Sequence, residues 1–231
     1  MFQAASASQV NEIPSFHSIL VRPISSTERF DWDTLMATHH YLGFRSLVGE
    51  SIRYVAEIHG RWVALLGWCA AALKCRPRDA WIGWPQVIQW QRLHLIANNA
   101  RFLILPGIHI PNLASRILSL NLRRLSTDWE HIHGHPVLLA ETFVDTSRYA
   151  GTCYRAANWM YLGHTRGFGK SSHRYFHHVQ KKAVFVRPLH KRALHWLSTA
   201  GTGASKIEAT TFEMLPLMKT ALRYGLAPGL E

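Results

Sequence analysis

The chain has few cysteines, few acidic residues and no long hydrophobic run. Its three cysteines (Cys69, Cys75 and Cys153) form no CxxC pair and no secreted disulfide framework, which indicates reduced thiols in a cytoplasmic protein. The longest apolar run, residues 62–73, is too short to span a bilayer, and no signal-peptide pattern begins the chain. We therefore expect a cytoplasmic protein with no membrane partner.

The scarcity of acidic residues is uneven along the chain. The formal net charge is +12, and the segment from Thr146 to Ile207 holds eleven Lys and Arg residues and no Asp or Glu. Aromatic residues such as Tyr154 and Trp159 are interleaved with these cations, a composition typical of surfaces that bind phosphates and stack bases. The segment predicts contact with nucleic acid; a solvated basic face is the simpler alternative.

The length of 231 residues and the 48% hydrophobic content suit one fairly large domain. We predict a flexible leader at 1–15, a folded domain at 16–197, and a linker followed by a C-terminal helix within 198–231. The linker prediction depends on the Gly, Ser, Thr and Ala content of residues 198–205.

Hydrophobic periodicity predicts a mixed α/β (α+β) fold. The expected strands include a hairpin at 51–58 and 62–72, a short strand at 101–106, and later strands at 137–144, 160–165 and 183–189. Expected helices include one from Ser25 to about Tyr41, with Ser25 and Glu28 as a capping box, one that Asn112 caps, and one beginning near Ser147. A strand, a helix and a strand in succession make the two strands parallel.

The resulting order, β-α-β-β-β-α-β-α-β-β, predicts a centrally parallel sheet flanked by helices. Over residues 16–190 it resembles the acetyltransferase-like, or GNAT, fold. That resemblance implies a loop of close-approach glycines whose amides hold the coenzyme A pyrophosphate. The corresponding segment, "PGIHIPNLAS" at 106–115, instead has two prolines, which lack amide donors. We therefore expect the chain not to use acetyl-CoA, and keep an acyltransferase with a degenerate loop as the alternative.

Carboxylates in the apolar part of the chain are candidate catalytic or metal-binding residues. Glu141 lies in a strand that is buried by its composition, so it is expected to pair with Arg101 or Arg155, or to act as a base or metal ligand. Asp79, beside Arg78, has the same alternatives. Asp145 is interpreted as the cap of the helix near Ser147. If the chain is catalytic, Glu141 and Asp79 are the candidate acids and ligands of Mg²⁺ or Mn²⁺.

Several runs in order resemble the family of the Druantia anti-phage protein DruA: "HYLG" (40–43), "RDAWIGW" (78–84), "NNARFLILP" (98–106), "PNLASRIL" (111–118), "ETFVD" (141–145) and "GTCYRAANW" (151–159). The resemblance implies a prokaryotic defence system or mobile element, with nucleic acid nearby and protein partners from the same system. Where that family has Gly-Arg-Gly, this chain has "GFG" at 167–169.

Together these features predict a protein that acts on single-stranded or structured DNA, with metal-dependent cleavage or strand transfer as its chemistry. The alternatives are the acyltransferase and a non-catalytic adaptor that binds nucleic acid. The residues expected to contact nucleic acid are Arg78, Asn98, Asn99, Arg101, Arg155, Asn158, Arg166 and Lys170.

Overall fold

The computed structural model describes residues 19–171, 174–177 and 180–199. The predicted leader at 1–15 and the predicted C-terminal helix, expected after the linker at 198–205, lie outside these residues. No helix in the described part of the chain is long and apolar enough to cross a membrane.

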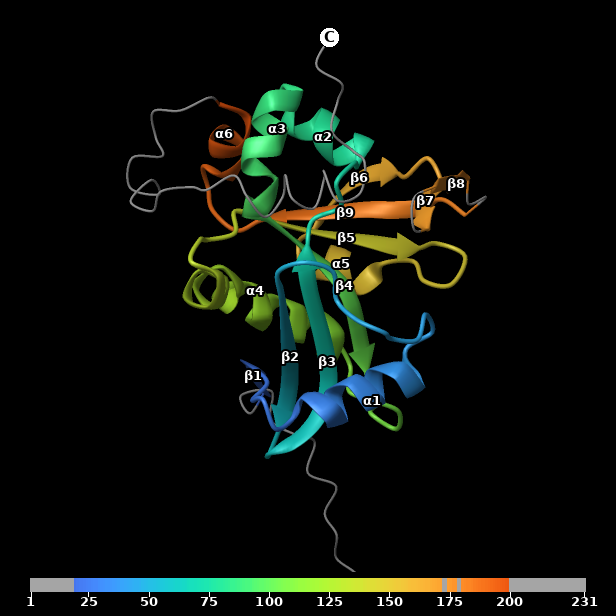
Figure 1. Ribbon diagram of the computed structural model, residues 1–231. Coiled ribbons are helices and arrows are strands. Elements are labelled where there is room, and N and C mark those ends of the chain that lie inside the picture. Colours follow the sequence, from blue (N-terminus) through green and yellow to red (C-terminus); the bar gives the residue numbers. More distant parts are fainter. Residues whose placement is uncertain (1–18, 172–173, 178–179, 200–231) are drawn as a thin grey trace, which may run out of the picture.

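The described strands form one seven-stranded sheet and a separate two-stranded hairpin (Figure 1). Neighbours in the large sheet follow the order β1-β2-β3-β4-β5-β9-β6, and every pair is antiparallel except β4 with β5. The strands are β1 (Ile19–Pro23), β2 (Ser51–Ile58), β3 (Arg61–Ala70), β4 (Ile96–Ile104), β5 (Leu139–Asp145), β6 (Met160–His164) and β9 (Lys182–Pro188). The predicted mixed sheet, with parallel strands at its centre, is confirmed.

The hairpin of β2 and β3 forms where the sequence predicts it. His59 and Gly60 both have positive φ, 49° and 72°, which a tight two-residue turn between twisted strands requires. Both strands are nearly all buried after their first residues, because helices cover the two faces of this part of the sheet.

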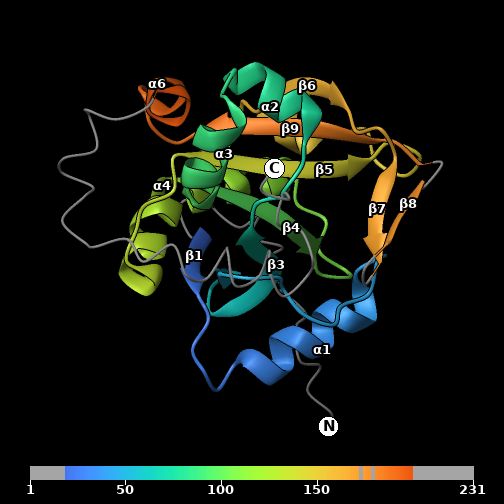
Figure 2. The ribbon, with the colours of Figure 1, turned by 45° about the horizontal axis from the view of Figure 1, so that its top comes forward.

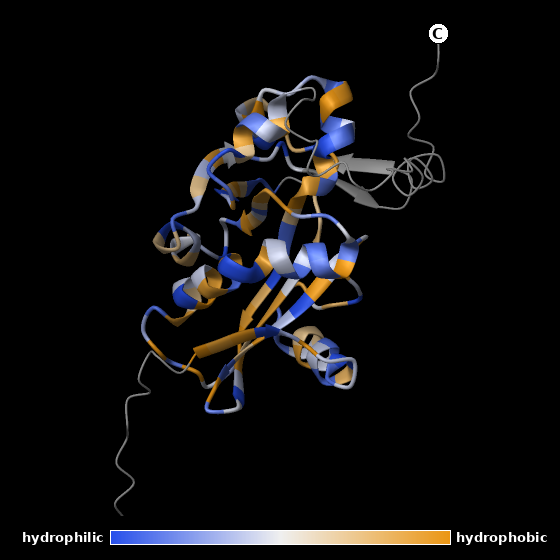
Figure 3. Cartoon of the chain, turned by 90° about the vertical axis from the view of Figure 1, so that its left-hand side faces the viewer, coloured by the Kyte–Doolittle hydropathy of each residue, from blue (hydrophilic) through white to orange (hydrophobic). Residues whose placement is uncertain are grey.

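Two layers of helices enclose the sheet (Figures 1 and 2). One face packs against α4 (Leu113–His133) and α5 (Thr152–Ala156), around Tyr54, Trp68 and Phe185. The other face carries α1 (Arg29–His39) over Val55 and Leu65, and a group formed by α2 (Arg76–Ile82), α3 (Gln86–Arg92), the 3₁₀ turn Leu93–Leu95 and α6 (Ala193–Ser198). The helices carry both hydrophilic and hydrophobic residues, as Figure 3 shows, which fits elements with one face in water.

Two predicted boundaries are wrong in ways that affect the site. Strand β4 begins at Ile96 rather than Arg101, so Asn98 and Asn99 belong to the sheet. Helix α5 begins at Thr152 rather than near Ser147, because residues 146–148 form turns and Gly151 has a φ of 70°. Between the predicted strands at 160–165 and 183–189, the structure adds the hairpin of β7 (Phe168–Ser171) and β8 (Arg174–His177), which projects from the end of the large sheet (Figure 2).

Candidate functional site

The central feature of the fold is a split in the sheet between its two parallel strands. Strands β4 and β5 pair only over three positions, Ile96–Asn98 with Leu139–Glu141. Beyond these pairs β4 continues to Ile104 and β5 to Asp145 in diverging directions, as Figure 1 shows. In the described structure, the main-chain groups of β4 that point away from β3 therefore have no strand partner past this point.

A β-bulge lies where the split begins. Asn99 pairs with Trp68 and Arg101 with Gly67, so Ala100 is an extra residue in β4. Because side chains alternate along a strand, the extra residue moves Asn99 and Arg101 to opposite faces. Asn99 points to the face covered by α4 and α5, and Arg101 to the face covered by α1.

Three side chains close the inner end of the split on the α5 face. The Tyr154 hydroxyl donates to Asn99 Oδ1 at 2.9 Å, and Thr142 Oγ1 donates to the Asn99 carbonyl at 3.0 Å. Thr142 Oγ1 also lies 3.4 Å from the Tyr154 hydroxyl. Tyr154 is buried, and burial raises its pKa, so the phenol keeps its proton at neutral pH.

Tyr154 is held in place by its aromatic neighbours. Its ring stacks on Phe185 with centroids 5.9 Å apart and meets Trp159 edge-on at 5.1 Å. Sequence reasoning counted Tyr154 only as an aromatic residue among cations. Its "GTCYRAANW" context in the family resemblance was the one available signal, and that signal does not reveal the hydrogen bond to Asn99.

On the opposite face, Glu141 pairs with Arg78. Both side chains are fully buried, and Arg78 NH1 lies 2.8 Å from Glu141 Oε2. The Ala72 amide donates to Glu141 Oε1 at 2.7 Å, and Arg78 also donates to Asp79 and to the Ala72 carbonyl. Burial raises the pKa of Glu141, while Arg78 and the Ala72 amide oppose that rise. The partner is thus neither Arg101 nor Arg155, the two predicted ones.

This ion-pair network corrects three site assignments. Arg78 is enclosed and saturated with acceptors, so it cannot contact a DNA phosphate. Glu141 and Asp79 share Arg78 between them and do not form a metal site. No group of three or more His, Cys, Asp or Glu residues in the described part of the chain is placed to hold a metal ion. The prediction of Mg²⁺ or Mn²⁺ was therefore wrong for these carboxylates.

Asp145 has a local structural role, although not as a helix cap. Its Oδ1 accepts hydrogen bonds from the Ser147 amide at 3.0 Å, the Ser147 hydroxyl at 2.7 Å and Gln180 Nε2 at 2.7 Å. The Ser147 hydroxyl bond is the main cause that lowers the pKa of Asp145. The side chain closes the turn after β5 and ties it to Gln180, two residues before β9.

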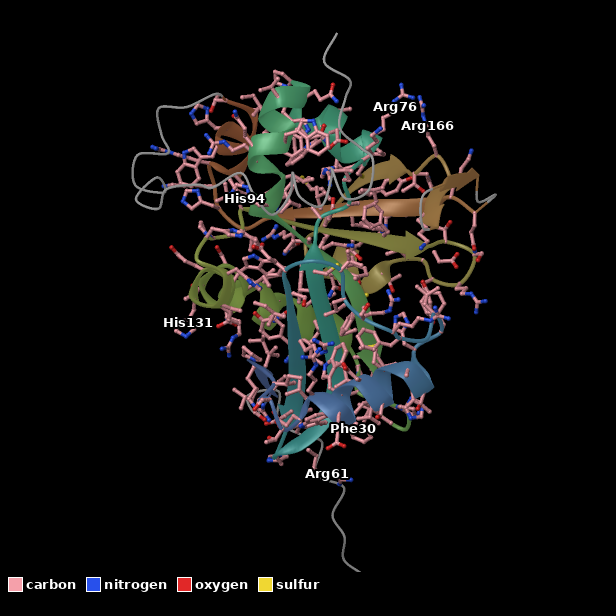
Figure 4. All side chains as sticks on the ribbon, in the orientation of Figure 1. Phe30, Arg61, Arg76, His94, His131 and Arg166 are labelled. Atoms are coloured by element: carbon pink, nitrogen blue, oxygen red, sulfur yellow. The ribbon has the colours of Figure 1, made fainter. Side chains whose placement is uncertain are left out.

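The remaining predicted contacts are scattered. Arg155, Asn158 and Arg166 are exposed, and Figure 4 shows Arg166 projecting outward from the molecule. Lys170 lies on β7, where the structure describes no side chains. Asn98 lies on the Glu141 face, where its Oδ1 is buried without a hydrogen-bond partner among the described residues, and Asn99 is occupied by Tyr154. The structure therefore does not bring the eight residues together.

Helix α4 begins beside the split, directly after the loop at 105–112. Asn112 has a φ of 58° and makes no side-chain cap, so the predicted capping by Asn112 was wrong. The Leu113 amide bonds to Ile110 and the Arg116 amide to Asn112, while the Ala114 and Ser115 amides have no bond to any residue that the structure describes. The positive end of a 21-residue helix thus presents two amides despite the prolines before it.

Comparisons with known proteins bear on both the family and the fold. The model of the family described as Druantia protein DruA matches residues 3–193. The chain therefore belongs to the DruA family, as the sequence runs indicated. Comparison with curated proteins gives no match by sequence.

Similar solved structures are acetyltransferases. The aminoglycoside acetyltransferase AAC(6')-Ib with coenzyme A is 13% identical, with a TM-score of 0.50 over 77% of this chain and 98% of that one. The same enzyme with paromomycin and acetyl-CoA is 12% identical, with a TM-score of 0.50 over 77% and 96%. Spermidine N-acetyltransferase from Vibrio cholerae, with CoA and spermine, is 11% identical, with a TM-score of 0.49 over 75% and 96%. The predicted acetyltransferase-like fold is confirmed.

The two structures of AAC(6')-Ib overturn the expectation against acetyl-CoA. That enzyme shares the fold and holds coenzyme A or acetyl-CoA, and Pro106 and Pro111 remove amide donors from the loop alone. In this chain the split between β4 and β5 and the amides of Ala114 and Ser115 remain, and neither depends on the missing glycines.

Proposed function

We propose that this member of the DruA family binds an acyl-coenzyme A in the split between β4 and β5 and transfers the acyl group to a nucleophile. The observation that carries the proposal is the early divergence of the two parallel strands, with the Tyr154 hydroxyl at its inner end. The shared acetyltransferase fold supports it.

The split fits the chemistry of the coenzyme. Its pantetheine arm is an extended chain with two amides, and an unpaired strand edge binds such a chain by main-chain hydrogen bonds. Strand β4 offers this edge between Phe102 and Ile104. The amides of Ala114 and Ser115, at the start of α4, would face the phosphates.

Tyr154 supplies the proton that acyl transfer from a thioester needs. When a nucleophile displaces the thiol, the sulfur leaves as a thiolate and takes up a proton. The raised pKa of Tyr154 keeps the phenol protonated, and the bonds to Asn99 and Thr142 fix its position. In this role Tyr154 would turn its hydroxyl hydrogen from Asn99 Oδ1 to the sulfur and act as a general acid, with Asn99 and Thr142 as positioning residues.

Isothermal titration with acetyl-CoA tests the proposal. We expect the wild-type chain to bind it, and Ser115→Glu to weaken binding because a carboxylate would face the coenzyme phosphates. Ser119→Glu, one turn further along α4, is the matched control and should bind as the wild type does. A wild-type chain that does not bind acetyl-CoA at millimolar concentration would refute the proposal.

A second variant separates chemistry from binding. Tyr154→Phe keeps the ring packing but removes the hydroxyl, so acetyl-CoA should bind as before while release of coenzyme A slows by about 10²-fold or more. Tyr161→Phe, on the exposed edge strand β6, is the control. It should change neither the affinity for acetyl-CoA nor the rate of coenzyme A release. Equal turnover in the wild type and Tyr154→Phe would exclude Tyr154 as the acid.

A second candidate function, contact with DNA, is favoured by the cations of the C-terminal half. Arg155 lies over the rings of Tyr161 and Phe185 at 5.3 and 5.2 Å, and Arg166 and Lys181 are also exposed. No carboxylate ion pair is shown for these three side chains in the described structure, so they are available to phosphates. Their positive charge and their exposure to solvent suit contact with a phosphodiester backbone.

The test is a titration of single-stranded and duplex DNA at several salt concentrations. Arg155→Ala and Arg166→Ala should each weaken binding and make the salt dependence shallower by about one unit of slope. Arg61→Ala, in the turn at the other end of the sheet (Figure 4), should bind as the wild type does. Unchanged DNA affinity in both variants would refute this assignment.

A further inference from the structure

Arg101 carries a charge that the described protein does not balance. Its Nε donates to the Gly43 carbonyl at 3.3 Å and its NH1 to the Ala100 carbonyl at 2.8 Å, and no ion pair is shown for it. Other partly or fully buried arginines of the sheet and its flanks, Arg22, Arg53 and Arg78, bond to carboxylates. Burial lowers the pKa of Arg101, which reflects the cost of an uncompensated cation.

The surroundings of Arg101 favour an anion. The loop between α1 and β2 crosses in front of β3 and β4 in Figure 1 and brings His40 and Tyr41 to this face. Burial and the neighbouring Arg101 lower the pKa of His40 to about 4, so its ring is neutral at pH 7. The guanidinium of Arg148 lies 5.4 Å from the Tyr41 ring centre, which adds a second cation to the same side.

The carboxylates on this side have other partners. Asp145 is bonded to Ser147 and Gln180, with Arg148 at 3.7 Å, and Glu141 is enclosed by Arg78. The bulge at Ala100 is what turns Arg101 towards this face, at the start of the split and opposite to Tyr154. A ligand bound beside Arg101 would therefore lie across β4 from the proposed acid.

We propose that Arg101, Tyr41 and Arg148 form a phosphate-binding subsite on the α1 face of the split. The subsite would hold a phosphate group of the molecule that accepts the acyl group. Its role as an acceptor site rests on the proposed function, but binding of phosphate there does not. A phosphate is favoured over a carboxylate because two guanidiniums and a hydroxyl donor match an oxyanion of higher charge.

The first experiment measures binding of inorganic phosphate by isothermal titration at low ionic strength, with acetate as the carboxylate comparison. We expect phosphate to bind more tightly than acetate, and Arg101→Met to weaken phosphate binding by about tenfold or more. Arg61→Met, an exposed arginine in the β2–β3 turn, should leave the affinity unchanged. Equal affinity in wild type and Arg101→Met, or equal affinity for acetate and phosphate, would overturn the proposal.

Two further variants guard against a folding defect in Arg101→Met. Arg101→Lys keeps the charge but loses the planar donor pair, and Tyr41→Phe removes only a hydroxyl. Each should bind phosphate more weakly than the wild type while keeping its melting temperature within a few degrees. Normal phosphate binding by both variants would overturn the assignment.

The source of the phosphate is distinguished with a dinucleotide that carries a 5′-phosphate and its unphosphorylated form. If the wild type binds the 5′-phosphorylated dinucleotide more tightly and Arg101→Met removes that difference, the subsite holds a terminal phosphate. If the wild type binds the two dinucleotides equally and Arg101→Met weakens both, the subsite holds the phosphodiester. Either result supports the subsite. Binding of both dinucleotides that is indifferent to Arg101→Met would refute it.

Titrations with coenzyme A separate this inference from the proposed function. Phosphate affinity that persists with coenzyme A present supports a subsite distinct from the coenzyme phosphates, and direct competition overturns it. If acetyl-CoA fails to bind the wild type while phosphate binding still depends on Arg101, the proposed function fails and the subsite stands.

Discussion

The buried pair of Arg78 and Glu141 makes a prediction that separates a structural role from a catalytic one. Glu141→Gln keeps the shape of the side chain and removes its charge. Arg78 then retains Asp79 and the Ala72 carbonyl as partners, but its NH1 loses a charged acceptor at 2.8 Å. We expect the folded chain to persist with a clear loss of stability.

The magnitude follows from the burial of both partners. Removing one partner of a buried ion pair costs about 3–5 kcal/mol, and the residual contact with Asp79 places this case near 3 kcal/mol. In a domain of this size each kcal/mol lowers the melting temperature by about 2–4 °C, so we expect a fall of about 6–12 °C. Urea unfolding followed by circular dichroism measures the free energy directly.

The control is the exposed pair of Arg29 and Asp33, whose closest atoms are 3.8 Å apart. Arg29→Ala should change the free energy of unfolding by less than about 0.5 kcal/mol. The double variant Arg78→Met with Glu141→Gln should lose less than the sum of the single variants, because neither then leaves a buried charge unpaired. A loss below about 1 kcal/mol for Glu141→Gln would refute the structural role.

Three further predictions concern the frame around the split. Gly151→Ala should cost about 1–3 kcal/mol, because φ is 70° and the added Cβ would lie 2.9 Å from two Phe185 ring carbons; Gly134→Ala, with φ of 81° and open space, should cost less in the same urea assay. Asn121→Ala should cost about 1–3 kcal/mol, because it removes the acceptor 2.5 Å from the buried Trp68 Nε1; an unchanged urea midpoint would contradict this. Arg22 holds the pKa of Glu28 at about 2, below its usual 4.5, so the stability from this carboxylate is present above pH 4.5 and lost as the pH falls through 2; Glu28→Gln should flatten the pH dependence of the urea midpoint in that window.

The elements that depend on local pattern were predictable. Residues 51–58 and 61–70 form the hairpin that their apolar runs and the His59-Gly60 turn indicate, and α4 follows its apolar repeat. Helix α5 was predicted too long because Gly151 and the turn at Asp145 interrupt a pattern that reads as continuous. The turn at Asp145 and the positive φ of Gly151 together set that boundary.

The contacts of the site could not be predicted, because they join residues far apart in sequence. Arg78 and Glu141 are 63 positions apart, and Asn99 and Tyr154 are 55 apart. A buried carboxylate such as Glu141 needs a cationic partner, and Arg101 and Arg155 were predicted because both are arginines that could supply it. Arg101 lies on the same face as Glu141, but it is three positions beyond Asn98, the residue of β4 that pairs with Glu141, and Arg78 of α2 reaches the carboxylate instead. The bulge at Ala100 sets the face to which Arg101 points, and no residue type in "NNARF" marks a bulge.

The short pairing of β4 and β5 also has a consequence for how the protein opens and forms. Strands β1 to β4 come from one continuous stretch of chain and pair only as antiparallel neighbours, whereas β5, β6 and β9 follow later and are joined to them by three residue pairs. We expect such a narrow seam to open more readily than the antiparallel pairings on either side of it, and native-state hydrogen exchange of the β4 and β5 amides would measure this. During synthesis β1 to β4 are complete in sequence before β5 emerges, so the split becomes a site only when β5 arrives to form its other wall.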